Sequence, residues 1–122
     1  MAEEADAAAF LDLHQITEGH TLVVPRRHLA SLGELDDTSA VAMWSLARRV
    51  ASAIRGSGLR CDAINLLLAD GAVAGQEVFH SHLHVVPRWA GDGFGYRLPP
   101  GHGPPVARAA LDTAAAQIRR RL

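Results

Sequence analysis

Three histidines alternate with other residues in the segment Gly75-Gln76-Glu77-Val78-Phe79-His80-Ser81-His82-Leu83-His84-Val85-Val86-Pro87-Arg88. A β-strand repeats every two residues, so we expect the rings of His80, His82 and His84 to share one face of a sheet. The intervening side chains then point to the other face, and three of the four are apolar enough to belong to a core: Phe79, Ser81, Leu83 and Val85, of which Ser81 is the polar one. Imidazole titrates nearest to neutral pH, so this cluster is suited to nucleophilic, acid–base or metal chemistry.

The length and composition of the chain indicate one domain over residues 1–122. The chain has 122 residues, of which 48% are apolar. This length is sufficient for one ordinary core and too short for two. The 12 Lys and Arg residues nearly balance the 13 Asp and Glu residues. This balance argues against nucleic acid and against an anionic membrane as partners, so an anionic ligand has to be held locally.

The cysteine content and the start of the chain indicate the compartment. Cys61 is the single cysteine, which excludes an internal disulfide and a multi-cysteine zinc site. No apolar run approaches the roughly 20 residues that span a bilayer, and the acidic start at residues 1–4 lacks the features of a signal peptide. We therefore expect a soluble, unsecreted, cytoplasmic protein.

The first half of the chain predicts two strands and a long helix. The strands are residues 9–13 and the β-branched run Thr21–Pro25, joined by a turn at Glu18-Gly19. The helix covers residues 37–56, since N-cap candidates precede apolar residues at spacings of three and four. Those apolar residues are Met43, Leu46, Ala47, Val50 and Ile54.

The second half predicts a strand within residues 61–69, antiparallel to the histidine strand that follows it. Residues 90–105 are too rich in glycine and proline for a regular element, and we interpret them as a loop that could cover a site. Residues 106–122 fit a helix with a basic end. The expected fold class is thus α+β, a mostly antiparallel sheet with the long helix on its apolar face and the histidines on the other.

The histidine spacing by itself leaves three chemistries open. Alternating imidazoles could bind zinc with an open position for a substrate. A neutral imidazole could instead attack an electrophile such as phosphorus, while its neighbours stabilise the developing charge. The three residues could also be ordinary hydrogen-bonded histidines, although three of them in register beside Gly75-Gln76 make this the weakest of the readings.

The segment from Ala69 to Arg88 resembles the signature of the histidine-triad (HIT) family of nucleotide hydrolases and transferases. The family pattern is His-x-His-x-His followed by apolar residues, with Gly-Gln upstream and Pro-Arg downstream. The segment from Phe10 to His28 is similar to the strand-turn-strand of the same family, with its Gly-His-x-Leu-Val-x-Pro core. Two separate motifs in the right order, over roughly residues 9 to 95, make chance an unlikely cause.

The resemblance implies a covalent mechanism. His82 would attack the α-phosphorus of a purine nucleotide derivative through Nε2, and water would then cleave the nucleotidyl-histidine. The main-chain carbonyl of His80 would hold the Nδ1–H of His82, and His84 would bind a phosphate oxygen. The substrates implied are adenosine phosphoramidate, an aminoacyl adenylate or a diadenosine polyphosphate, and family members usually form homodimers.

The resemblance also implies binding residues, each of which has a plainer structural explanation. Asp12 would accept from a ribose hydroxyl or merely cap a turn, and Leu13 would pack on the base or belong to the core. Asn65 would contact ribose or phosphate. Gln76 would bind the phosphate or only the adjacent loop, and His28 would support His80 or lie free on the surface. We expect His20 to be a structural hydrogen-bonding residue.

The chain departs from the family pattern at the zinc ligands. Many members carry a Cys-x-x-Cys segment that binds structural zinc together with two histidines, and this sequence has no such pair. We therefore predict no bound metal and no cofactor. Two other classes of function remain open, a nucleotide-binding module without useful turnover and a metal-dependent hydrolase. Ala69 stands where relatives often have an amide, which leaves the leaving-group contact in question.

Overall fold

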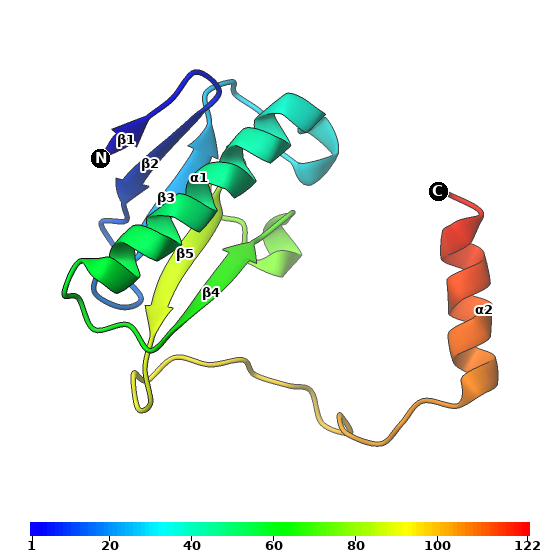
Figure 1. The fold of residues 1–122 in the computed structure, drawn as a ribbon. Helices are drawn as coiled ribbons and strands as arrows, with labels where there is room; N and C mark the ends of the chain where they lie inside the picture. The colour runs from blue at the N-terminus through cyan, green and yellow to red at the C-terminus, as the bar shows by residue number, and fades with distance from the viewer.

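The computed structural model describes residues 1–122 and is built on a five-stranded sheet in the order β1-β2-β3-β5-β4, with every neighbouring pair antiparallel. The strands are β1 (Ala2–Glu3), β2 (Ala7–Leu11), β3 (Thr21–Pro25), β4 (Ala63–Leu68) and β5 (Leu83–Arg88). Two 3-10 turns, η1 (Leu32–Glu34) and η2 (Ala72–Ala74), lie in the connections. The predicted α+β class and antiparallel sheet are confirmed (Figure 1).

The long helix α1 (Asp37–Gly56) has the bounds that its sequence pattern predicts. Asp36 caps its start, because its carboxylate accepts a hydrogen bond of 2.8 Å from the backbone N–H of Ser39. The helix lies across one face of the sheet and contacts β2, β3 and β5 (Figure 1). An amphipathic period and a local cap are sufficient to place such a helix from sequence.

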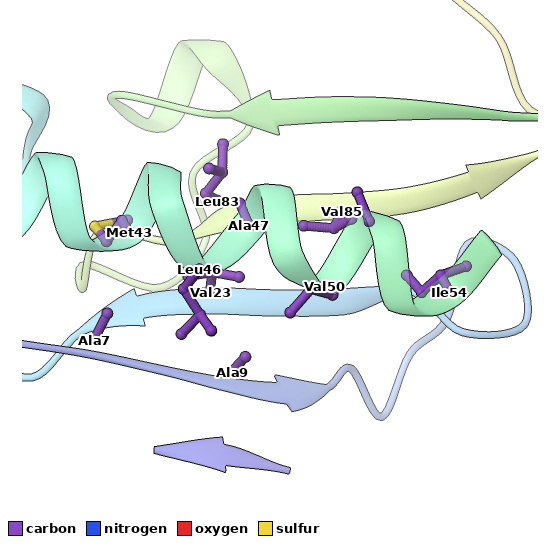
Figure 2. Close-up of a cluster of buried hydrophobic side chains, with 11 residues drawn as sticks. Ala7, Ala9, Val23, Met43, Leu46, Ala47, Val50, Ile54, Leu83 and Val85 are labelled. Atoms are coloured by element: carbon purple, nitrogen blue, oxygen red, sulfur yellow. The ribbon is translucent and has the colours of Figure 1, made fainter. Parts of the chain in front are cut away.

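The core lies between α1 and the sheet (Figure 2). The helix contributes Met43, Leu46, Ala47, Val50, Ala51 and Ile54, and the strands contribute Ala7, Ala9, Val23, Leu83 and Val85. The strand residues alternate along the sequence, as the pleat requires, so the intervening residues face away from α1. His84 is one of these, since its neighbours Leu83 and Val85 are both in the core.

Two strand predictions need correction. The first strand covers residues 7–11 and not 9–13, because Asp12 begins a turn in which its carboxylate accepts from the backbone N–H of His14 at 2.8 Å. The histidine strand begins only at Leu83, so His80 and His82 precede it. Phe79 is exposed, so the prediction that it belongs to the core is wrong.

The C-terminal helix α2 (Arg108–Arg119) is present as predicted and stands apart from the sheet and α1 (Figure 1). None of its residues is buried. No helix of the protein combines the length and the apolar composition needed to cross a membrane.

Candidate functional site: a histidine cluster at the start of β5

The sheet holds His84 by its backbone, while His82 and His80 lie on the irregular segment just before β5. In the register of the sheet, His84 is opposite Leu22 on β3 and Leu67 on β4. The rings of His82 and His84 are 4.9 Å apart between centroids, with an angle of 66° between their planes. The ring of His80 instead stands edge-on to that of His28 at 5.1 Å. The expectation that all three rings share one strand face is therefore wrong, because regular strand geometry starts after His82.

His82 has one nitrogen bound and one free. Its Nδ1 lies 2.7 Å from the main-chain oxygen of His80. A carbonyl only accepts, so the proton of neutral His82 is on Nδ1 and the lone pair is on Nε2. Nε2 makes no hydrogen bond within the protein. The ring thus presents an unprotonated nitrogen at the surface of the site.

A chain of hydrogen bonds determines the opposite tautomer for His84. The backbone N–H of Ile16 donates to Nδ1 of His20 at 3.3 Å, which leaves the proton of neutral His20 on Nε2. That Nε2 lies 2.9 Å from Nδ1 of His84 and donates to it. Neutral His84 therefore carries its proton on Nε2, which makes no hydrogen bond within the protein and can donate to a ligand.

His20 is a structural hydrogen-bonding residue, as the sequence analysis expects, but the sequence did not identify His84 as its partner. It is 1% exposed, stacks on His84 at a centroid distance of 5.1 Å, and lies on the turn before β3. Asp12 Oδ2 is 3.6 Å from His20 Nδ1, too far for a hydrogen bond, so we assign the Ile16 N–H as the partner of this nitrogen. Since 64 residues separate His20 from His84, no local pattern could pair them.

Burial and neighbouring imidazoles keep this pair neutral. Desolvation, followed by the proximity of His82 and His20, lowers the pKa of His84 from 6.5 to about 4. Desolvation is also the main cause that lowers the pKa of His20, against an opposing effect of Asp12. Both rings are thus uncharged at neutral pH, which is the state that the tautomer assignment requires.

His80 and His28 form a second histidine pair. The Nδ1 atoms of the two rings are 3.2 Å apart, and His80 Nε2 lies 3.0 Å from the carbonyl oxygen of Pro25. Donation of the His80 Nε2–H to that carbonyl leaves Nδ1 to accept from His28. The His80 side chain therefore anchors the segment before β5 to the end of β3, while its backbone oxygen contacts His82.

Gln76 is buried and braces the loop before the histidines. Its Oε1 accepts from the backbone N–H of Gly71 at 2.8 Å. Its Nε2 donates to the carbonyl oxygens of Ala30 at 2.7 Å and Val78 at 3.2 Å. Both of its N–H groups are used, so the side chain has no donor left for a phosphate. The plainer of the two explanations, a bond to the adjacent loop, describes this structure.

Asp12 and Leu13 lie at the end of β2, on the side of the cluster. Asp12 is half-buried between the His14 N–H that it caps and the ring of His20. The core alternative for Leu13 is wrong, because this side chain is 94% exposed. An apolar side chain so open to solvent is free to pack on a ligand.

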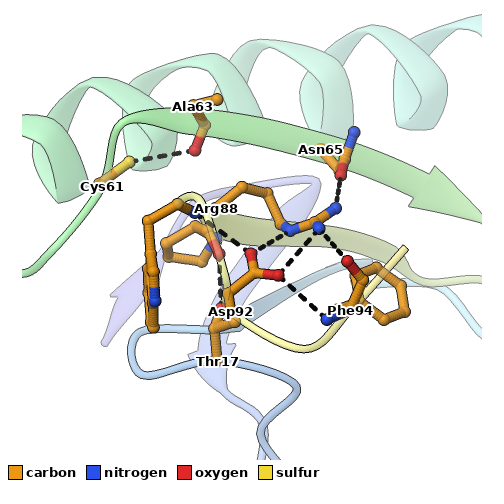
Figure 3. Close-up of polar contacts among 9 residues, drawn as sticks. Thr17, Cys61, Ala63, Asn65, Arg88, Asp92 and Phe94 are labelled. Atoms are coloured by element: carbon orange, nitrogen blue, oxygen red, sulfur yellow. Dashed lines mark hydrogen bonds and ion pairs between the residues drawn. The ribbon is translucent and has the colours of Figure 1, made fainter.

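Asn65 belongs to a polar network that orders the chain after β5 (Figure 3). Arg88 donates to Asn65 Oδ1 and to the Phe94 carbonyl oxygen, and it pairs with Asp92 at 2.6 and 3.1 Å. The same carboxylate accepts from the backbone N–H groups of Trp89 and Phe94. These contacts hold the pKa of Asp92 well below its usual range. The Asn65 amide N–H groups remain without a partner.

A cavity of about 420 Å³ opens beside His84. Most of its lining is apolar, and it includes Ile16, Leu67 and Phe94. The Arg88–Asp92 network holds Phe94 in place, since Arg88 bonds its carbonyl and lies over its ring at 4.7 Å from the ring centroid. The cavity thus joins an apolar wall to a neutral histidine donor, a combination common in small-molecule sites.

The histidines do not form a complete zinc site. The Nδ1 atoms of His28 and His80 lie 3.2 Å apart, but the sequence offers no thiolate pair to complete a site with them. The group Asp12, His20 and His84 has ligand atoms within 4.8 Å of one another. Two of its ring nitrogens already bond each other, His20 Nε2 and His84 Nδ1, and the group offers no fourth protein ligand. A structural four-coordinate zinc therefore does not fit the residues present.

The fold and the site define an α+β protein with a neutral histidine cluster at the edge of an apolar cavity. The family model described as HIT domain matches residues 1–91, and the chain belongs to the HIT family. An uncharacterized HIT-like protein of Borreliella burgdorferi is 43% identical over 90 residues, covering 73% of this chain and 65% of that protein. The chain thus spans just under two thirds of that relative.

Solved structures of HIT proteins have the same fold. A HIT family member from Bacillus subtilis matches with a TM-score of 0.90 and 35% identity, covering 100% of this chain and 86% of that chain. A zinc-bound histidine triad family protein from Mycobacterium smegmatis matches with a TM-score of 0.73 and 36% identity, covering 99% and 86%. The prediction from the sequence that the chain is a HIT family member is confirmed.

Proposed function

We propose that this protein is a nucleotidyl hydrolase or transferase that forms a covalent intermediate on His82. The observation that carries the proposal is the pair of free ring nitrogens, a lone pair on His82 Nε2 beside an N–H on His84 Nε2, on rings 4.9 Å apart. A nucleophile next to a neutral hydrogen-bond donor suits attack on a phosphate ester or amide.

In the proposed first step, the His82 Nε2 lone pair attacks the α-phosphorus of a purine nucleotide derivative. A P–N bond forms, and the leaving group departs with the electrons of its bond to phosphorus. The ring becomes cationic, and the Nδ1–H bond to the His80 carbonyl stabilises that charge. Water, or another acceptor in a transferase, then breaks the P–N bond and restores neutral His82.

The remaining residues would bind the substrate. His84 donates its Nε2–H to a non-bridging oxygen, and Asn65 offers its free amide N–H groups to ribose or phosphate. Asp12 accepts from the ribose, and Leu13 packs on the base. Gln76 and His28 act indirectly, Gln76 by bracing the loop and His28 through His80. This assignment changes the expected role of Gln76 from contact to support.

Adenosine phosphoramidate, aminoacyl adenylates and diadenosine polyphosphates remain the proposed substrate types, because each puts a leaving group on an α-phosphorus. The nucleotide-binding module without turnover stays the alternative, since its pocket would look the same. The proposed setting is a cytoplasmic homodimer, with no metal and no cofactor in the reaction.

Mass spectrometry of protein mixed with adenosine 5′-phosphoramidate tests the covalent step. We expect a nucleotidylated His82 peptide in a rapid acid quench, and loss of about a thousand-fold or more of the activity in His82→Ala. His102→Ala, in the exposed loop, is the matched control and should react like the native protein. Equal slow turnover by the native protein and His82→Ala would sink the enzyme proposal, and tight AMP binding without an adduct would favour the binding module.

Metal analysis separates the covalent route from a metal-dependent hydrolase. We expect less than stoichiometric zinc in protein purified without added metal, and activity that survives a chelator. Stoichiometric zinc would contradict the proposed absence of a bound metal, and chelator-sensitive turnover would favour the metal-dependent hydrolase.

A further inference from the structure

Arg88, the last residue of β5, has a guanidinium whose donors are almost all used within the protein (Figure 3). Its Nε and Nη2 donate to the two carboxylate oxygens of Asp92, at 2.6 and 3.1 Å. Nη1 donates to Asn65 Oδ1, and Nη2 also donates to the carbonyl oxygen of Phe94. The side chains of Arg88 and Asp92 are only 18% and 3% exposed. This pair therefore differs from an ordinary surface salt bridge, and it fixes the groups that it contacts.

The pair holds the backbone of Phe94 at both of its polar groups. Arg88 binds the carbonyl oxygen of Phe94, and Asp92 Oδ1 accepts from its backbone N–H at 3.0 Å. The Asp92 carboxylate also accepts from the backbone N–H of Trp89 at 3.2 Å, which closes the turn after β5. Phe94 belongs to no strand or helix. These contacts, and not a sheet ladder, therefore determine where Phe94 lies.

The ring of Phe94 forms part of the wall of the cavity beside His84. The guanidinium carbon of Arg88 lies 4.7 Å from the centroid of this ring, and the cavity has a volume of about 420 Å³. The end of β4 and the residue after it supply aliphatic side chains to the same wall, including Leu67 and Ala69. No Asp, Glu, Lys or Arg belongs to the lining. A group that enters the cavity thus meets an uncharged wall that Arg88 completes through Phe94.

The direction of attack matches this cavity with the leaving group of the substrate. In the reaction proposed above, His82 Nε2 attacks phosphorus, and the attacking and leaving atoms lie roughly in line in phosphoryl transfer. The leaving group therefore points away from His82. The cavity is lined by His84 and not by His82, and the proposed ribose and base contacts, Asp12 and Leu13, do not line it either.

We propose that Phe94 determines specificity for the leaving group and that Arg88 is the positioning residue that holds its ring in place. The site then prefers a leaving group that is uncharged and apolar. The inference rests on the proposed function and distinguishes between the substrate types named there. A substituted phosphoramidate or an aminoacyl adenylate can put an apolar group into the cavity.

A diadenosine polyphosphate suits this cavity poorly. It would place phosphate charges against a wall without a cation, and a charge that leaves water without a partner is costly. Arg88 does not supply the missing cation, because Asp92 neutralises its guanidinium and its donors are bound to protein groups.

Kinetics with two substrates test the role of Phe94. Adenosine 5′-phosphoramidate releases ammonia, whereas adenosine 5′-(N-benzyl)phosphoramidate releases an amine with an apolar ring. The quantity measured is the ratio of kcat/KM for the N-benzyl compound to kcat/KM for the unsubstituted one. Comparing this ratio between variants cancels the intrinsic reactivity of the two leaving groups. We expect Phe94→Ala to lower the ratio at least about five-fold, and Phe94→Leu, which restores an apolar side chain, to recover most of it.

Three further variants test whether Arg88 acts through Phe94. Arg88→Met keeps an extended side chain without donors, and we expect it to lower the ratio as Phe94→Ala does. The double variant should lower the ratio no further, because the two residues act as one unit. Asp92→Asn weakens the same pair from its other side and gives a second test if Arg88→Met does not fold. The matched control is Arg108→Met, since Arg108 also pairs with an aspartate at i+4 but is 85% exposed, and its ratio should equal that of the native protein.

The outcomes that overturn the inference differ from those that overturn the proposed function. A native ratio in Phe94→Ala would refute the role of Phe94. Equal losses with both substrates in Arg88→Met, at a native ratio, would make Arg88 purely structural. Faster native turnover of diadenosine triphosphate than of the N-benzyl compound would refute the apolar preference. If the native protein turns over none of these compounds, the proposed function fails, and the ratio of their dissociation constants in the same variants tests the wall by itself; a protein that binds none of them overturns both.

Discussion

Substitutions of His20 test whether the tautomer of His84 matters for activity. In the structure His20 Nε2–H donates to His84 Nδ1 at 2.9 Å, and the two rings stack at 27°. His20→Phe keeps an aromatic ring at this position but removes the donor. His20→Gln removes the ring and can restore the donor with its side-chain amide. The two variants therefore separate hydrogen bonding from ring packing.

The size of the effect follows from one hydrogen bond. A neutral hydrogen bond contributes about 1 kcal/mol net, and leaving a buried acceptor unpaired costs about 1–3 kcal/mol. If about 1–2 kcal/mol of this favours the Nε2–H tautomer of His84, its loss lowers kcat/KM by about 5–30-fold. We expect that decrease in His20→Phe and a decrease within about three-fold in His20→Gln.

The assay combines kinetics with nitrogen NMR. Turnover of adenosine 5′-phosphoramidate gives kcat/KM, and the ¹⁵N shifts of His84 report which ring nitrogen holds the proton. The native protein should show Nε2–H, and His20→Phe should show a mixture. A His20→Phe variant with native kinetics and a native His84 spectrum would refute the reasoning. A His20→Gln variant as impaired as His20→Phe would assign His20 to packing alone.

Three further outcomes follow from named contacts. Because His84 has a pKa of about 4 in the fold and 6.5 as its ordinary value, the unfolded chain binds more protons between these values, and stability falls as pH drops from 6.5 to 4. Because His84 is only partly buried, we expect the loss in unfolding free energy to be about 1–2 kcal/mol, less than the full pKa shift implies. Urea unfolding of His84→Asn should therefore depend less steeply on pH than that of the native protein. An equal pH dependence would contradict this. Asp92→Asn should speed amide exchange in residues 89–95, because it breaks the Arg88 pair, whereas Asp112→Asn, in an exposed pair with Arg108, should change little. Leu46→Ala should cost about 2–5 kcal/mol of unfolding free energy and the exposed Val41→Ala less than about 0.5, since only Leu46 is in the core; similar losses would argue against the described core.

Elements with strong local signals were predictable. The helix at residues 37–56 combines a capping aspartate with a regular apolar period, and both act within a few residues of one another. The β-branched run of β3 has the predicted bounds for the same reason. The start of the histidine strand was not predictable from alternation, because η2 and the loop braced by Gln76 extend the connection from β4 up to His82.

The binding residues divide in the same way. The roles of Asp12 and Gln76 could not be assigned from sequence, because each side chain can bind either a ligand or nearby backbone groups. Which of these it does depends on the backbone groups that the fold places beside it. Asp12 caps His14, and Gln76 spends both of its amide N–H groups on carbonyls. Whether Asp12, Leu13 and Asn65 touch a nucleotide stays a prediction.

The identity of the three histidines, the family and the amphipathic helix follow from the order of residues alone, because motif spacing and periodicity are local properties. The unequal roles of those histidines come from tertiary contacts. The His80 carbonyl leaves a lone pair on His82 Nε2. His20, 64 residues away in sequence, puts the proton on Nε2 of His84, whose side chain lines the cavity. A proton's position on an imidazole depends on its hydrogen-bond partner, and only the folded chain supplies that partner.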